Sequence, residues 1–336
     1  MKPTDFSKYL TEYFTNYLPL QKNASINTIH SYRDTFKLLL RYCSEEKNIT
    51  PEKITLEKLD KFLVLDFLEW LEIEKNNSIS TRNLRLAAVH SFFRYVQTED
   101  PTQIFNFQKV ISIPIKKAPK TAVDYLSPDA MKILLSQPDK YTRKGRRDLT
   151  LMSTLYDSGA RVQKLIDLKV SDVILTSQPV IILNGKGNKV RRIPLMNNTK
   201  VLLEKYIQEN YLFESWKGDY PLFFNNQRSK LTRKGVAYII SKYVPSARLE
   251  SPQVPKRVKS HQFRHSKAMH LLQAGVNLIY IRDFLGHVDL KTTEIYARHD
   301  TEAKRKAIEK AFPNIIDKNL PDWNEDKSRQ NPRGRK

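Results

Sequence analysis

The chain has 336 residues, of which 58 are Lys or Arg and 36 are Asp or Glu, so its net charge is +22. A hydrophobic content of 40% suffices for two domains with cores of their own, and the positive surplus favours a polyanionic partner such as nucleic acid. The single cysteine, Cys43, excludes an internal disulfide. No apolar run reaches the length of a membrane span or forms a signal-peptide core, so we expect a cytoplasmic, DNA-associated protein.

The first hundred residues carry apolar positions at helical spacing, which predicts a small all-helical domain over residues 1–100. Ser80 is expected to cap the last of its helices, and Leu84 to pack in the core. Cys43 lies on an apolar helical face and is expected to be a buried structural thiol. Four helices are predicted, over residues 3–20, 27–43, 56–75 and 81–96.

Helical periodicity is lost between Asp100 and Val123, where prolines alternate with lysines. We therefore expect residues 101–123 to form an extended linker, which could also lie along a DNA backbone. Basic side chains of this segment and of the preceding helix are candidates for contacts with DNA phosphates, although each alone is better explained as a solvated surface charge. These candidates are Arg82, Arg85, Lys116, Lys117 and Lys120.

Residues 124–313 combine helical periodicity with two short strands, which predicts a mixed α+β domain. The strands, 180–183 and 189–195, flank a glycine-rich turn and predict a β-hairpin. Gly159 and Gly286 are expected to end helices in the left-handed conformation. Helices are expected from Pro128 onward and over residues 148–158, 161–168, 201–210, 231–243, 261–273, 278–285 and 301–312.

The segments between these elements are polar. Residues 141–147 predict a basic loop, and residues 245–259 predict a loop rich in proline and lysine. The end of the chain, residues 314–336, is basic and poor in apolar residues, so we expect a disordered tail.

The stretch from Ser260 to Arg298 gathers imidazoles, guanidiniums and a phenol in a short piece of helix and loop. Arg and His bind phosphate, and a tyrosine hydroxyl can act as a covalent nucleophile, so the stretch indicates phosphoryl chemistry on a tyrosine. Each residue alone has an ordinary structural explanation. Tyr296 could be a core aromatic, and His265 is expected to pack against the site or support it. The joint pattern favours the chemical interpretation.

Four motifs follow one another along the second half of the chain. Residues 155–161 read LYDSGAR, residues 185–195 read GKGNKVRRIPL, residues 261–265 read HQFRH, and LGH at 285–287 stands nine residues before Tyr296. Their order and spacing resemble those of the tyrosine recombinases, also called the phage integrase family. The resemblance covers about residues 8–312 and includes an N-terminal core-binding, SAM-like domain. It implies a mainly α protein whose two domains form a C-shaped clamp around duplex DNA.

The resemblance assigns the phosphate-binding side chains of the site. Arg161 and Arg264 would hold the non-bridging oxygens of the scissile phosphate, because a guanidinium presents a planar fork of donors. His287 would hydrogen-bond the same phosphate. Lys189 and Arg191, on the hairpin, are further candidates for DNA contacts. These basic groups take the place that a metal has in other phosphoryl-transfer enzymes, so neither a metal nor another cofactor is expected.

The resemblance also assigns the covalent step and its proton transfers. Tyr296 would attack phosphorus and form a 3′-phosphotyrosyl link, which conserves the bond energy and makes ATP unnecessary. His261 would act as general base or proton relay for the tyrosine, and Lys186 would protonate the leaving 5′-oxygen, with Lys189 as a rival for that role. The chain departs from the family where an acidic residue is usual three positions after Arg161, because Lys164 stands there. The site is therefore expected to need another carboxylate, or DNA itself, to assemble.

These assignments predict a site-specific recombinase for integration, excision or transposition. The helix 301–312 would dock on a neighbouring protomer in a tetrameric synapse. The partners implied are duplex DNA, further copies of this chain and accessory recombinases. Two alternatives remain open at the level of sequence: a type IB-like DNA topoisomerase, and a non-catalytic DNA-binding regulator that retains the fold. The basic, proline-containing tail favours a mobile element of the transposon type over a phage or chromosomal role.

Overall fold

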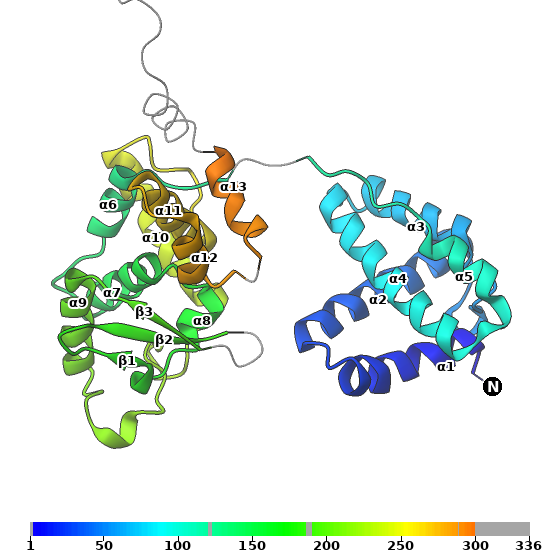
Figure 1. The fold of residues 1–336 in the computed structure, drawn as a ribbon, viewed down its shortest axis with the longest axis horizontal. Helices are drawn as coiled ribbons and strands as arrows, with labels where there is room; N and C mark the ends of the chain where they lie inside the picture. Colours follow the sequence, from blue (N-terminus) through cyan, green and yellow to red (C-terminus); the bar gives the residue numbers. More distant parts are fainter. Residues whose placement is uncertain (1–2, 120–122, 186–189, 288, 300–336) are drawn as a thin grey trace, which may run out of the picture. The chain divides into compact units, whose positions relative to one another are not determined.

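The computed structural model describes residues 3–119, 123–185, 190–287 and 289–299 (Figure 1). The chain divides into two compact units, Met1–Thr121 and Ala122–Lys336, which are described separately below. Within the described ranges, no helix combines the length and the apolar composition that crossing a membrane requires.

Unit 1 is built from helices whose starts are fixed by side chains that accept hydrogen bonds from backbone N–H groups. Helix α4 begins after Ser78, whose hydroxyl accepts from the N–H of Thr81, so the cap lies two residues before the predicted Ser80. Helix α1 runs directly into a π-helical segment, Tyr13–Gln21. The α-helices described in this unit are α1 (Asp5–Glu12), α2 (Ile26–Lys47), α3 (Lys61–Ile73), α4 (Ile79–Glu99) and α5 (Ile104–Ile111).

The core of unit 1 is aromatic. The Tyr13 ring lies 5.3 Å from that of Phe92 in an edge-on arrangement, and its hydroxyl donates to Ser91 Oγ at 2.8 Å. Cys43 is fully buried, as predicted. Leu84, predicted to be in the core, is instead 52% exposed. It lies on the face of α4 that turns away from the neighbouring helices.

Helix α5 corrects the prediction that residues 101–123 form an extended linker. Its Phe107 and Val110 are buried, and the rings of Phe93 and Phe107 lie 5.7 Å apart, so α5 belongs to the core of unit 1. The apolar stretch is only 8 residues long and follows a proline turn, which left too few positions to show helical periodicity. The predicted four-helix domain therefore contains one more packed helix.

Unit 2 contains a small antiparallel sheet in the order β1-β2-β3. The strands are β1 (Val173–Ile174), β2 (Val180–Asn184) and β3 (Val190–Pro194). The hairpin was predicted, whereas the two-residue β1 was too short to recognise. Ile181 pairs with Ile193 across the sheet, and both side chains are buried against the helices. The register pairs Asn184 with Val190 at the adjoining ends of β2 and β3.

The described part of unit 2 also contains a group of α-helices. They are α6 (Pro128–Ser136), α7 (Arg143–Ser158), α8 (Val162–Ile166), α9 (Asn197–Glu209), α10 (Arg233–Glu250), α11 (Ser260–Gln273), α12 (Leu278–Leu285) and α13 (Lys291–His299). Helices α11, α12 and α13 contact one another and lie side by side in Figure 1. Ser127 caps α6 and Gly159 ends α7 at φ 55°, as both were predicted to do.

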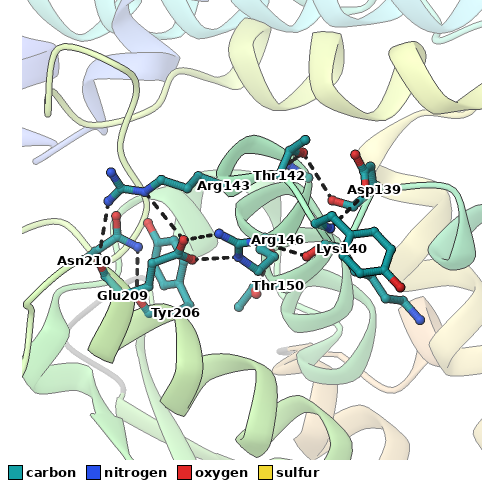
Figure 2. Close-up of polar contacts among 11 residues, drawn as sticks. Asp139, Lys140, Thr142, Arg143, Arg146, Thr150, Tyr206, Glu209 and Asn210 are labelled. Carbon is teal, nitrogen blue, oxygen red and sulfur yellow. Dashed lines mark hydrogen bonds and ion pairs between the residues drawn. The ribbon is translucent and has the colours of Figure 1, made fainter.

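Two loops of the sequence prediction are helical in the structure. Helix α7 already begins at Arg143, inside the predicted basic loop, because Thr142 caps it. Its first turn is fixed to α9 by Arg146, which donates from Nε to Glu209 at 3.1 Å (Figure 2). Helix α10 continues through Pro245 to Glu250, where a loop was predicted. Burial of Val244 and Ala247 on either side of the proline offsets the hydrogen bond that proline removes.

Candidate active site

Among the predicted site residues that the structure describes, Arg264 is the most deeply buried charged one, at 2% exposure. Its guanidinium donates to the carbonyl of Gly159 at 2.6 Å and to that of Leu285 at 2.7 Å. Burial, together with the charge of Arg161, lowers the pKa of Arg264 to about 9, so the group keeps its charge at neutral pH. Arg264 therefore brings the ends of α7 and α12 together around a positive charge.

Arg161 lies three residues after the end of α7, at the N-terminus of α8, and its side chain is exposed. Burial is the larger cause of the lowered pKa of Arg264 and of His261. The charge of Arg161 lowers both pKa values further, and the charge of Arg264 adds to the effect on His261. The positive charges of the two arginines predicted to bind the phosphate thus act on the same group of side chains. An anion placed there would relieve their mutual repulsion.

Tyr296 lies on α13 and is 1% exposed. Its hydroxyl is 2.9 Å from Nδ1 of His265, and which of the two donates depends on the tautomer of the imidazole. Burial raises the pKa of Tyr296, while the charges of Arg264 and Arg161 lower it. The predicted nucleophile is therefore next to a nitrogen that can take its proton and in the field of both guanidiniums.

The histidine in contact with Tyr296 is His265, which the sequence suggested only as a packing or supporting residue. Burial, followed by the charges of His261 and Arg264, lowers the pKa of His265 to about 4, so its ring is neutral at neutral pH. The ring of His261 is 5.2 Å from that of His265, one turn earlier on α11. His261, which was assigned the role of base or relay, thus stands behind His265 and is exposed toward solvent.

His287 and Arg191 complete the cluster. His287 Nδ1 lies 2.9 Å from Thr293 Oγ1, and burial, followed by the charges of Arg264 and Arg161, lowers its pKa to about 4. Arg191 donates to the carbonyl of Phe284 at 2.8 Å and is half-buried. Gly286 has φ +63°, and a Cβ at this position would lie 2.4 Å from Arg191 Cζ. Arg191, predicted only as a DNA contact, is thus packed beneath the loop that carries His287.

The predicted DNA contacts of unit 1 divide into buried and exposed groups. Arg82 is 3% exposed, and its Nε lies 3.3 Å from Glu72. Arg85 donates to the carbonyl of Ser31, and Lys116 pairs with Glu72 at 2.8 Å. Arg82 and Arg85, expected on the surface, thus connect α2, α3 and α4, whereas Lys116 is exposed and joins the segment after α5 to α3. Lys117 is exposed. Three predicted residues lie outside the described ranges: Lys120, Lys186 and Lys189.

Sequence reasoning missed a buried carboxylate in unit 2. Asp157, in the last turn of α7, is 4% exposed and pairs with Lys267 of α11 at 3.0 Å. Its second oxygen accepts from the backbone N–H of Met196 at 2.7 Å. The signal in the sequence was a charged residue at the end of the otherwise apolar run of α7. It was overlooked because the motif chemistry gives it no role.

Comparisons with known proteins agree with this geometry. A family model described as "Phage integrase family" matches residues 124–303, and one described as "Phage integrase, N-terminal SAM-like domain" matches residues 11–100. The integrase/recombinase y4rC of Sinorhizobium fredii is 35% identical over 93% of this chain and 93% of its own length. Tyrosine recombinase XerD of Listeria monocytogenes is 31% identical over 90% of this chain and 98% of its own length.

Solved structures share the fold. XerH site-specific recombinase, in a post-cleavage complex with its palindromic difH substrate, has a TM-score of 0.68 at 22% identity and covers 85% of this chain and 80% of its own. The Tn1549 transposon integrase, in complex with a circular intermediate DNA, has a TM-score of 0.69 at 17% identity and covers 93% of this chain and 100% of its own. With both domain families matched in order and relatives aligned over nine-tenths of its length, the chain belongs to the phage integrase family of tyrosine recombinases.

Proposed function

We propose that Tyr296 is the nucleophile with which this chain, as a site-specific recombinase, cuts and rejoins duplex DNA. Membership of the family supplies the reaction class, which is breakage and rejoining of DNA. The observation that carries the residue assignment is the 2.9 Å contact between the Tyr296 hydroxyl and His265 Nδ1, in the field of two arginines. The positive surplus of the chain suits the phosphate backbone of the substrate.

In the proposed reaction, Arg161 and Arg264 bind the non-bridging oxygens of the scissile phosphate. Arg264 has five N–H donors, so its two bonds to carbonyl oxygens leave others for the phosphate. The Tyr296 oxygen forms a bond to phosphorus as the bond to the 5′-oxygen breaks, which gives a 3′-phosphotyrosyl link and a 5′-hydroxyl. Rejoining is the reverse attack by a 5′-hydroxyl and needs no external energy source.

Two protons move in this step. The proton of Tyr296 passes to His265, which it contacts, and His261 relays it toward solvent. The 5′-oxygen takes its proton from Lys186, a role that rests on the hairpin motif because this residue lies outside the described ranges. A bound phosphodiester raises the pKa of His265 and His287 from about 4, because its negative charge favours the imidazolium. DNA thereby makes both rings better proton acceptors.

The assembly around this site is part of the proposal. Residues 1–100 and 124–313 would close on duplex DNA as a clamp, with exposed basic residues such as Lys117 on the backbone. The helix predicted at 301–312, which lies outside the described residues, would dock on a neighbouring protomer in a tetrameric synapse. The names of relatives include an integrase/recombinase and a transposon integrase, which supports integration, excision or transposition as the setting.

The experiment uses a pool of nicked duplexes with a randomised core sequence, from which covalent protein–DNA adducts are recovered and sequenced. A nick beside the cleavage point releases a short 5′ fragment and traps the adduct. Wild-type chain is expected to yield adducts, and Tyr296→Phe none. Tyr280→Phe is the matched control, because Tyr280 is 71% exposed and lies on the adjacent helix α12. Adducts from Tyr296→Phe, or their absence from wild type, would refute the assignment.

A further inference from the structure

The contact between α7 and α11 is unusually polar for the interior of a domain. Three side chains of α11 at three-residue spacing, and hence on one face, each meet the last turns of α7. Arg264 donates to the carbonyl of Gly159, Lys267 pairs with Asp157, and His270 Nδ1 lies 2.8 Å from the hydroxyl of Tyr156. We call these three pairs the α7–α11 ladder. Sliding or rotating either helix would break all three pairs at once.

The middle pair of the ladder is an ion pair with both partners buried. The side chains of Lys267 and Asp157 are 10% and 5% exposed. The ammonium also lies 5.2 Å from the centre of the Tyr156 ring and 6.0 Å from that of Phe284, so aromatic rings line part of its remaining surface. A buried ion pair is seldom more stable than apolar residues of the same volume, and its best-attested use is to fix one arrangement among several.

Asp157 reaches a third segment as well. Its second carboxylate oxygen accepts from the N–H of Met196 at 2.7 Å, two residues after the end of β3. Asp157 itself stands on the helix that leads into Arg161. Its carboxylate binds the segment just after β3, in the hairpin whose motif contains Lys186, and through Lys267 it binds α11, which carries His261 and Arg264. These are the segments with the predicted phosphate-binding and proton-transfer residues.

We propose that Asp157 is a positioning residue for DNA cleavage, which holds the three motif-bearing segments in register through Lys267 and the Met196 N–H. The proposal rests on the proposed function of the site. It also identifies the carboxylate that the departure at Lys164 led us to expect: it stands four residues before Arg161 instead of three after it. Asp157 needs no contact with DNA for this role. Its loss should slow cleavage without weakening DNA binding.

The test compares variants on a nicked duplex recovered from the selection described above. Asp157→Asn combined with Lys267→Met removes both buried charges and keeps an oxygen for the Met196 N–H, so this neutral pair should fold. Melting temperature, DNA affinity and the cleavage rate at saturating DNA are measured for each. We expect affinity close to wild type and cleavage slower by about 10- to 100-fold, because small displacements of reacting groups have effects of this size.

The matched control is the ion pair of Arg146 and Glu209, which joins the opposite end of α7 to α9 (Figure 2). Arg146 lies 11 residues before Asp157, which is about 16 Å along a helix. Arg146→Met with Glu209→Gln should leave the cleavage rate unchanged. If the neutral pair at Asp157 and Lys267 cleaves as fast as wild type, the positioning role is wrong while the nucleophile stands. If wild type forms no adduct, the proposed function fails and this inference with it.

A conservative variant keeps the test decisive if the neutral pair does not fold. Asp157→Glu retains the charge and both acceptor oxygens but extends the side chain by one methylene. It is expected to fold, to bind DNA with unchanged affinity and to cleave several-fold more slowly. Cleavage at the wild-type rate by a folded Asp157→Glu chain would overturn the positioning role.

Discussion

Replacement of Gly286 by alanine should destabilise unit 2 through two separable effects. An alanine held at φ +63° costs about 1–2 kcal/mol because its Cβ approaches the following carbonyl. The same Cβ would lie 2.4 Å from Cζ of Arg191, so the guanidinium must move and give up its hydrogen bond to the Phe284 carbonyl. Loss of a hydrogen bond from a charged donor costs about 1.5–3 kcal/mol more.

Gly275 provides the control for the backbone effect alone. It follows α11 at φ +82°, and a Cβ there would meet nothing within 4 Å. At about 2–4 °C per kcal/mol for a domain of this size, thermal melting should fall about 3–12 °C further for Gly286→Ala than for Gly275→Ala. In an Arg191→Met background the two substitutions should have equal effects. Equal effects in the wild-type background would refute the packing argument for Arg191.

Two further predictions concern charge. The pKa of His265 lies at about 4, below the value near 6.5 of an unfolded chain, so the unfolded state binds more protons between these values and stability falls as pH drops through that window. His265→Asn should flatten the decline of melting temperature from pH 7 to 4.5, and an unchanged slope would contradict this. Arg82→Met should lower the melting temperature without changing DNA affinity, because Arg82 is buried beside Glu72, whereas exposed Lys117→Ala should weaken DNA binding in a filter-binding titration. The opposite order of affinities would place DNA on a different face of unit 1.

The family and the local structure around its motifs could be predicted because both depend on short-range signals. Gly159 and Gly286 end helices in the left-handed conformation, which their positions after apolar helical runs indicated. The hairpin followed from a glycine-rich turn between two apolar strands. Such signals act within a few residues and need no knowledge of the tertiary contacts.

The parts that could not be predicted depend on contacts between distant segments. Arg82 was expected at the surface, but α3 supplies Glu72 and the chain after α5 covers it. His265 and His261 are one turn apart on α11, and only the placement of α13 decides which one meets Tyr296. Asp157 and Lys267 are 110 positions apart, so neither indicates the other in the sequence.

Arg264 has a consequence for how degenerate copies of such genes should be interpreted. Its guanidinium binds carbonyl oxygens at the C-terminal ends of α7 and α12, where the helix dipoles are negative, so it stabilises the fold whether or not DNA is ever cut. Arg161, by contrast, is exposed and is free to drift once catalysis is no longer selected. In decaying lineages, substitutions at Arg161 should therefore accumulate before those at Arg264, and an intact Arg264 is a marker of a foldable chain instead of an active enzyme.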